Sequence, residues 1–213
     1  MDKILFFCAH NDDQVIGAGG TIAKYAKEGK EVYTVIFSHG EKSHPHMKPE
    51  HIIPTRIKEA KLCDKSLGGK GITFLNLNEG KFVEEFDKQN LNKKIKEMIL
   101  KLKPSKIFLH GIDDPHPDHQ AVFKIISKLI SDIKFKGDVY MYDVWTLINL
   151  RKRNEPKMIV DISNTLKIKI KAFKLHKTQQ TAILTLLWSI YLKAFIIGLN
   201  NGYKSAESFQ KLK

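Results

Sequence analysis

Short apolar runs of strand length alternate along the chain with longer stretches of helical periodicity. The first run, KILFFCA at residues 3–9, is apolar without a break from Ile4 to Ala9. Such a run is typical of a strand that is buried on both faces of a parallel sheet. The further expected strands are 31–38, 72–77, 106–111, 139–144 and 158–162. The expected helices are 15–28, 54–67, 86–102, one that begins near Pro117, and a helical tail that includes 182–199.

This alternation predicts an α/β fold, namely a doubly wound, mostly parallel, Rossmann-like sheet with helices on both faces. In the common strand order 3-2-1-4-5, the first and fourth strands are neighbours, and ligands bind between their carboxyl ends. The first strand ends in AHNDDQ (9–14), and the fourth is followed by HGIDDPHPDHQ (110–120). We therefore expect two clusters rich in histidine and aspartate to face each other across one crevice.

The chain of 213 residues has the length of one domain, and no repeat or linker divides it. We expect a single domain over 1–213, with a C-terminal helical part at about 163–213. Two cysteines, Cys8 and Cys63, do not form a disulfide framework and favour a reduced, cytoplasmic protein. The first residues lack the pattern of a signal peptide.

A formal net charge of +13 raises the question of a nucleic-acid partner. Only three of the 36 basic residues are arginine, and no stripe of arginine interleaved with aromatic residues appears. Proteins that recognise nucleic acid rely on such arginines and aromatic rings. The charge therefore reflects abundant lysine or an attraction for anionic substrates or lipid headgroups, and we expect no nucleic-acid partner.

The two clusters contain the ligands of a metal centre. Zinc binds imidazole nitrogen and carboxylate oxygen, and a catalytic site leaves one coordination position for water. His10 and Asp13 from the first cluster, with His119 from the second, would supply two histidines and one aspartate. Asp12 could then act as the general base on that water, and His116 could stabilise or protonate the charge that develops on the substrate.

Each cluster also has a purely structural interpretation. Aspartates before a helix often cap it, and HPDH could be a capped helix start with Asp118 in the first turn. A dinucleotide site is a further alternative, because GAGG (17–20) resembles a glycine-rich loop. That motif would require glycine where Ile22 stands and an acidic residue after the second strand, so we reject it.

Six motifs resemble those of the PIG-L/LmbE family of zinc-dependent de-N-acetylases. AHNDDQ is similar to the family signature Ala-His-Pro-Asp-Asp-Glu, and HPDH is complete at 116–119. Asn11 stands where the family has proline, and Gln14 stands where it has glutamate. The four further motifs, in chain order, are SHGE (38–41), RIKEAKLCDKSLG (56–68), HKTQ (176–179) and AESF (206–209).

The resemblance implies one zinc ion held by His10, Asp13 and His119, Asp12 as general base and His116 as electrophilic partner. It also implies that Arg56 and Glu79 contact the substrate. For Arg56 the structural alternative is a buried salt bridge to Glu59 or Glu41. For Glu79 the alternative is an ordinary surface loop residue.

The activity implied is removal of acetyl from an N-acetylated amino sugar of the N-acetylglucosamine type, free or lipid-linked. One alternative is a hydrolase of another acylated amine that uses the same site. The other is an inactive homologue that acts as a binding protein, because Gln14 removes one negative charge beside the metal.

The stretch AILTLLWSIYLKAFIIGL (182–199) is unusually apolar. A buried core helix, a helix at a homo-oligomer interface and a membrane-spanning helix are three interpretations, although 18 residues interrupted by Lys193 are short for the last. The fourth is a helix that lies on the membrane surface and would place the protein peripherally on the inner face.

Overall fold

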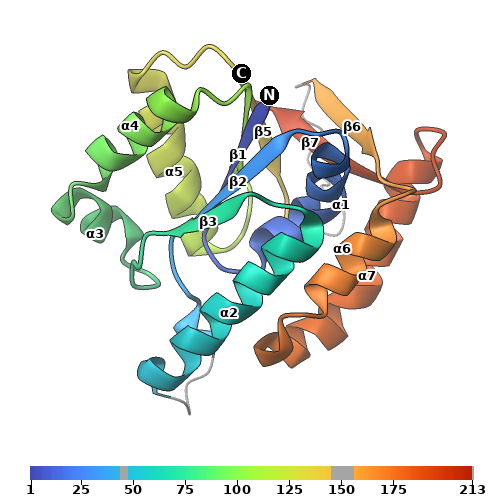
Figure 1. Ribbon diagram of the computed structural model, residues 1–213, viewed down its shortest axis with the longest axis horizontal. Helices are drawn as coiled ribbons and strands as arrows, with labels where there is room; N and C mark the ends of the chain where they lie inside the picture. The colour runs from blue at the N-terminus through green and yellow to red at the C-terminus, as the bar shows by residue number, and fades with distance from the viewer. Residues whose placement is uncertain (44–47, 145–155, 213) are drawn as a thin grey trace.

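The computed structural model describes residues 1–43, 48–144 and 156–212, and its strands form one mixed sheet of seven in the order β3-β2-β1-β4-β5-β7-β6 (Figure 1). The first five strands are mutually parallel and follow the predicted order 3-2-1-4-5. The predicted α/β fold class is therefore confirmed. The strands are β1 (Lys3–Cys8), β2 (Glu31–Ile36), β3 (Gly71–Phe74), β4 (Lys106–His110), β5 (Asp138–Tyr142), β6 (Lys157–Asp161) and β7 (Ala206–Lys211).

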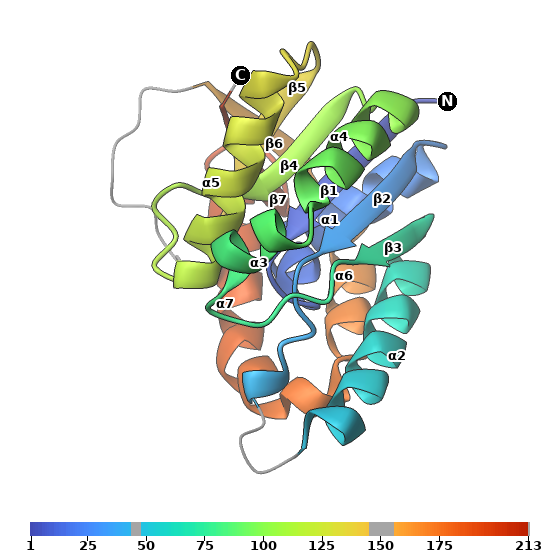
Figure 2. The same cartoon turned by 90° about the vertical axis from the view of Figure 1, so that its left-hand side faces the viewer.

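Helices cover both faces of the sheet (Figures 1 and 2). One layer contains α1, α2, α6 and α7, and the other contains α3, α4 and α5. The helices are α1 (Asp13–Lys27), α2 (Pro49–Leu67), α3 (Phe82–Lys88), α4 (Leu91–Leu102), α5 (Pro117–Asp132), α6 (Leu166–Phe173) and α7 (Gln180–Leu199), with short 3₁₀ turns at Glu41–Ser43 and Lys177–Gln179.

The apolar run of β1 supplies both layers, because successive side chains of a strand point to opposite faces. Ile4 and Phe6 pack in the core with α1 and α2, whereas Leu5 and Phe7 pack in the core with α4 and α5. All four are completely buried. This burial on both faces explains why the run shows no alternation with polar residues.

Two expected elements differ from the structure. The helix expected at 86–102 is two helices, α3 and α4, because Asn90 adopts a left-handed conformation with φ +53° that ends one helix before the next begins. The tail expected to be helical ends in strand β7, which inserts between β5 and β6 and runs antiparallel to both. Among the described helices, none combines the length and apolar character needed to cross a membrane.

Glu207 of β7 ties the end of the chain to the middle of α1. Its carboxylate accepts hydrogen bonds from the backbone N–H groups of Gly20 (3.0 Å) and Thr21 (2.7 Å) and forms an ion pair with Lys169 at 2.7 Å. Gly20 also lets Ile162 pack closely on α1, since a Cβ at position 20 would lie 2.7 Å from the Ile162 side chain. The AESF motif thus has a structural role in this chain.

We predict that Glu207→Gln lowers the free energy of unfolding by about 3 kcal/mol, because it leaves the buried ammonium of Lys169 without its counter-charge. The matched control is Glu28→Gln, which removes an ion pair of similar length, 2.8 Å, from the surface. That change should cost no more than about 1 kcal/mol. Urea unfolding measures both, and equal losses would contradict the role assigned to Glu207.

Candidate active site

The loops that follow β1 and β4 lie side by side, because the two strands are parallel neighbours in the sheet. The first loop leads into α1, and the backbone N–H of His10 donates to Asp13 Oδ2 at 2.7 Å. The second loop leads into α5, which carries His119 in its first turn. The structure therefore brings the two clusters together at the carboxyl ends of β1 and β4, as expected.

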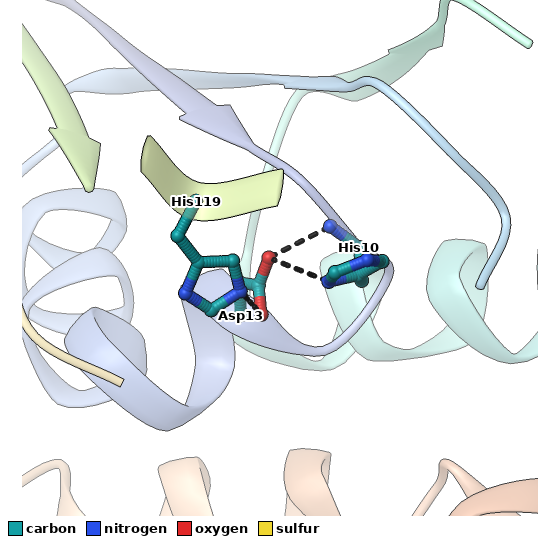
Figure 3. A group of neighbouring side chains, drawn as sticks. All are labelled: His10, Asp13 and His119. Carbon is teal, nitrogen blue, oxygen red and sulfur yellow. Dashed lines mark hydrogen bonds and ion pairs between the residues drawn. The ribbon is translucent and has the colours of Figure 1, made fainter. Parts of the chain in front are cut away.

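His10, Asp13 and His119 converge on one point (Figure 3). Asp13 Oδ1 lies 3.3 Å from His119 Nε2, and Asp13 Oδ2 lies 3.6 Å from His10 Nδ1. One potential ligand atom from each of the three residues lies within 4.8 Å of the other two. All three side chains are buried. The set of two imidazoles and one carboxylate is suited to a divalent metal such as zinc.

The charges of this cluster fit a bound cation. Burial alone would lower the pKa of His10, but hydrogen bonds to Asp118 and Asp13 outweigh it and raise the pKa to about 10. Burial would also lower the pKa of His119, but the charge of Asp13 and a hydrogen bond to Asp114 outweigh this effect and raise the pKa to about 9. The surrounding carboxylates thus stabilise positive charge where the ligand atoms meet, which is what a metal ion would supply.

Further carboxylates contact the other ring nitrogen of each histidine. Asp114 lies 2.9 Å from His119 Nδ1, and Asp118 and Glu79 each lie 3.3 Å from His10 Nε2. Such carboxylates fix the orientation of a ligating imidazole and raise its basicity. The sequence places Asp118 in the first turn of the expected helix without a further role, and no motif singles out Asp114. The signal for Asp114 is its place in the acidic pair that Pro115 separates from HPDH.

His110 is a further residue of this cluster that no sequence motif singles out. It ends β4, is fully buried, and stacks on His119 with ring centroids 3.9 Å apart. Its Nε2 lies 3.3 Å from Asp13 Oδ2. Burial and the neighbouring His119 lower the pKa of His110 to about 4, so the ring is neutral. A histidine at the carboxyl end of a strand next to β1 was the signal that could have found it.

Asp12 and His116 line a cavity of about 400 Å³ that opens in front of the three converging residues. Asp12 occupies the N-cap position of α1, but its side chain makes no capping hydrogen bond. The capping interpretation therefore does not account for this carboxylate. His116 is the N-cap of α5, and its Nδ1 accepts the N–H of Asp118 at 3.2 Å. In the neutral ring this bond leaves the proton on Nε2.

Arg56 and Glu79 line the same cavity. Arg56 is buried and donates from Nη1 to the Gly40 carbonyl at 2.9 Å. Gly40 has φ +72°, and a Cβ at that position would lie 2.6 Å from Arg56 Nη2, so the approach requires glycine. Glu79 Oε2 accepts the backbone N–H of Lys42 at 2.8 Å, and burial raises the pKa of its carboxyl group. The Glu79 side chain is 12% exposed and faces this cavity.

The two departures from the family signature lie inside the same loop. Asn11 and Gln14 are both buried, and the Gln14 side-chain amide donates to the Asn11 carbonyl at 3.2 Å. An ionised glutamate could not donate this hydrogen bond. Gln14 therefore closes the loop while carrying no charge. His44 and His46, which could act as substitute ligands, lie outside the described residues.

Comparison with known proteins agrees with the fold and identifies a family. Residues 5–130 match the family model described as GlcNAc-PI de-N-acetylase, PIG-L. The chain is 25% identical over 98% of its length to diacetylchitobiose deacetylase of Thermococcus kodakarensis, covering 82% of that protein. It is 27% identical to a probable N-acetyl-α-D-glucosaminyl L-malate deacetylase 2 of Bacillus cereus, with 85% of each chain covered.

Among solved structures, the 4-carboxy-2-hydroxymuconate hydratase GalB of Pseudomonas putida superposes with a TM-score of 0.86. It is 20% identical, and the match covers 100% of this chain and 97% of that one. Because the same fold carries a hydratase in that protein, the fold by itself does not decide the reaction.

The family match, together with the cluster of histidines and carboxylates, identifies a metal-dependent hydrolase. The chain belongs to the PIG-L family of de-N-acetylases, enzymes that hydrolyse an amide C–N bond.

We predict that His10→Ala, Asp13→Ala and His119→Ala each abolish tight metal binding, because each removes one of three converging ligand atoms. Metal content is measured on purified protein by plasma mass spectrometry. The matched control is His51→Ala, which removes an exposed histidine of α2 and should leave the metal in place. Full occupancy in any of the first three variants would exclude that residue as a required ligand.

We also predict that metal binding releases about two protons per ion at pH 7.5, one each from His10 and His119. Both groups have raised pKa values, about 10 and about 9, so both are protonated in the metal-free protein at that pH. Metal affinity should therefore fall as the pH is lowered below about 10, and more steeply below about 9. Calorimetry in buffers of different ionisation enthalpy measures the proton release, and its absence would contradict the assigned charges.

Proposed function

We propose that this protein is a zinc-dependent hydrolase that removes the acetyl group from an amino sugar of the N-acetylglucosamine type. The observation that carries the proposal is the cavity beside the candidate metal ligands His10, Asp13 and His119. Asp12, whose carboxylate makes no capping hydrogen bond, and His116 both line this cavity. A cavity of about 400 Å³ falls within the range of small-molecule sites.

His10, Asp13 and His119 would hold one zinc ion per chain. When bound, zinc would polarise the amide carbonyl and lower the pKa of the attacking water. Asp114 and Asp118 keep the two imidazoles in the orientation that ligation needs, through contacts of 2.9 and 3.3 Å. Their charge also offsets that of the ion in a buried site.

Asp12 acts as the general base in this proposal. Its carboxylate takes a proton from the water as the water oxygen attacks the amide carbon. The same proton is then transferred to the nitrogen of the sugar as the C–N bond breaks, so the products are acetate and a free amine. A carboxylate that makes no capping bond is available for both transfers.

His116 stabilises the negative charge that develops on the carbonyl oxygen. Because its Nδ1 is held by the N-terminus of α5, the neutral ring presents the Nε2 proton as a hydrogen-bond donor. The His116 ring lies against both ligand histidines, with centroid distances of 5.0 Å to His10 and 4.7 Å to His119. Burial and the neighbouring His119 lower the pKa of His116, which favours the neutral form.

Arg56 and Glu79 are the proposed substrate contacts, because both line the cavity beside the catalytic groups. A guanidinium and a carboxylate can bind the hydroxyl groups of a sugar and the oxygen of its acetyl group. The named activities of the two relatives, on diacetylchitobiose and on an N-acetylglucosaminyl malate, support a sugar of this class.

The assay described below distinguishes the free form of this sugar from the lipid-linked form.

We further propose that residues 1–213 act as one domain, since β7 pairs in the same sheet as β1. Cys8 and Cys63 are both free and buried, which supports a cytoplasmic location.

We predict that Asp12→Asn retains the metal but lowers kcat by a factor on the order of 1,000, because the amide cannot accept the proton of water. His116→Ala should also retain the metal and slow turnover by about 100-fold. The measurement is primary-amine and acetate release from N-acetylglucosamine, N,N′-diacetylchitobiose and a lipid-linked N-acetylglucosamine, with and without chelator.

A matched control is Asp87→Asn, which removes a carboxylate of α3 that does not line this cavity. Wild-type turnover by Asp12→Asn would show that another group is the base. A zinc-loaded wild-type protein that releases no amine from any of these sugars would favour the binding-protein alternative.

A further inference from the structure

Helix α7 presents a row of large apolar side chains to solvent. Leu184, Trp188, Tyr191, Phe195 and Leu199 recur at intervals of three and four residues, which places them along one face of the helix. Their exposed fractions lie between 47 and 79%. The α7 face, as we call it, consists of these five with three neighbours: Leu192, Ile196 and Tyr203.

The opposite side of α7 is already packed against the protein. Ile190 and Ala194 are buried, and Ile183, Leu186 and Leu187 pack against the core. Lys193, the only charged residue of the helix, is turned inward, with Nζ 3.4 Å from the Asp143 carbonyl oxygen. A helix that is apolar on all sides is normally buried on all sides. The α7 face therefore lacks a covering surface within the described part of the chain.

The size of the α7 face matches what one partner contributes to a stable complex. With exposed fractions of 38 to 79%, its eight side chains leave on the order of 800 Å² open to solvent, taking about 200 Å² for each side chain. A standard interface buries about 800 Å² per partner, whereas the largest apolar patch of a typical monomer is about 300–600 Å². Trp, Tyr and Phe, which the face contains, are the residues enriched in interface cores.

The distribution of charge over the surface favours a second copy of the chain as the partner of the α7 face. A net charge of +13 opposes contact between two copies of the chain over most of their surface. The α7 face carries no charged side chain, so two copies can meet there without burying like charges. We propose that the α7 face is a homodimer interface in which α7 of one chain packs against α7 of a second copy about a two-fold axis.

A two-fold arrangement is self-complementary, because each copy offers the same ridge of side chains to the other. A helix that lies on a bilayer differs from α7, since it has a strongly charged polar face opposite its apolar one. The inward side of α7 is instead apolar and packed on the core. Membrane binding is therefore the alternative that the experiment must separate from dimerisation.

The first test compares Leu192→Glu with Leu62→Glu. Both leucines are on helices and have similar exposure, 43 and 45%, but only Leu192 lies in the α7 face. Wild type and Leu62→Glu should sediment as dimers at micromolar concentration. Leu192→Glu should raise the dissociation constant by about tenfold or more, because each dimer would bury two unpaired carboxylates. Far-ultraviolet circular dichroism checks that each variant is folded.

The second test uses a cysteine and is independent of any loss of folding. Cys8 and Cys63 are buried, so Leu192→Cys adds an accessible thiol near the middle of the α7 face. Mild oxidation should cross-link this variant into a covalent dimer. The matched variant Leu62→Cys should remain uncross-linked under the same conditions.

The proposal is overturned if the wild type is monomeric at all concentrations tested, or if Leu192→Glu associates as tightly as Leu62→Glu. It is also overturned if the wild type is monomeric and co-sediments with vesicles of equimolar phosphatidylcholine and phosphatidylglycerol, and Leu192→Glu abolishes that binding. These measurements do not use enzymatic activity, so they stand apart from the proposed function.

Discussion

The parallel pairing of β1 with β4 is the constraint on which the site depends. Ile4, Leu5 and Phe6 are in register with the first three residues of β4, and the rings of Phe6 and Phe108 stack at 4.4 Å. Because parallel strands end at the same edge of a sheet, the loops that follow β1 and β4 must meet. Residues separated by about a hundred positions in the chain are thereby brought together in one cluster.

Asp13 connects the parts of this centre. Its two carboxylate oxygens lie within 3.3 to 3.6 Å of ring nitrogens from His10, His110 and His119. The positive charge of His119 and the hydrogen bond to His10 outweigh the penalty of burial and hold the pKa of Asp13 well below its usual range. An ionised carboxylate at the centre explains why histidines from both loops gather around it.

The sequence predicted these groups because each follows a local rule. Apolar runs without alternation indicated the buried parallel strands, and the strand order then brought His10, Asp13 and His119 to one crevice. The sequence signals for Asp114 and His110 are weak, since an aspartate in a loop and a histidine at the end of a strand are common. Their roles depend on contacts of 2.9 and 3.3 Å that exist only after folding.

The amino-acid sequence by itself determined the class of fold, the order of the parallel strands and the proposed ligand set, because periodicity and motif spacing are properties of neighbouring residues. Only the tertiary structure decided where β7 inserts and which side of α7 faces solvent. An apolar helix and a short terminal strand are compatible with several packings. In this chain the hydrogen bonds from Gly20 and Thr21 to Glu207 stabilise one of these packings, with β7 between β5 and β6. In that packing one face of α7 is exposed.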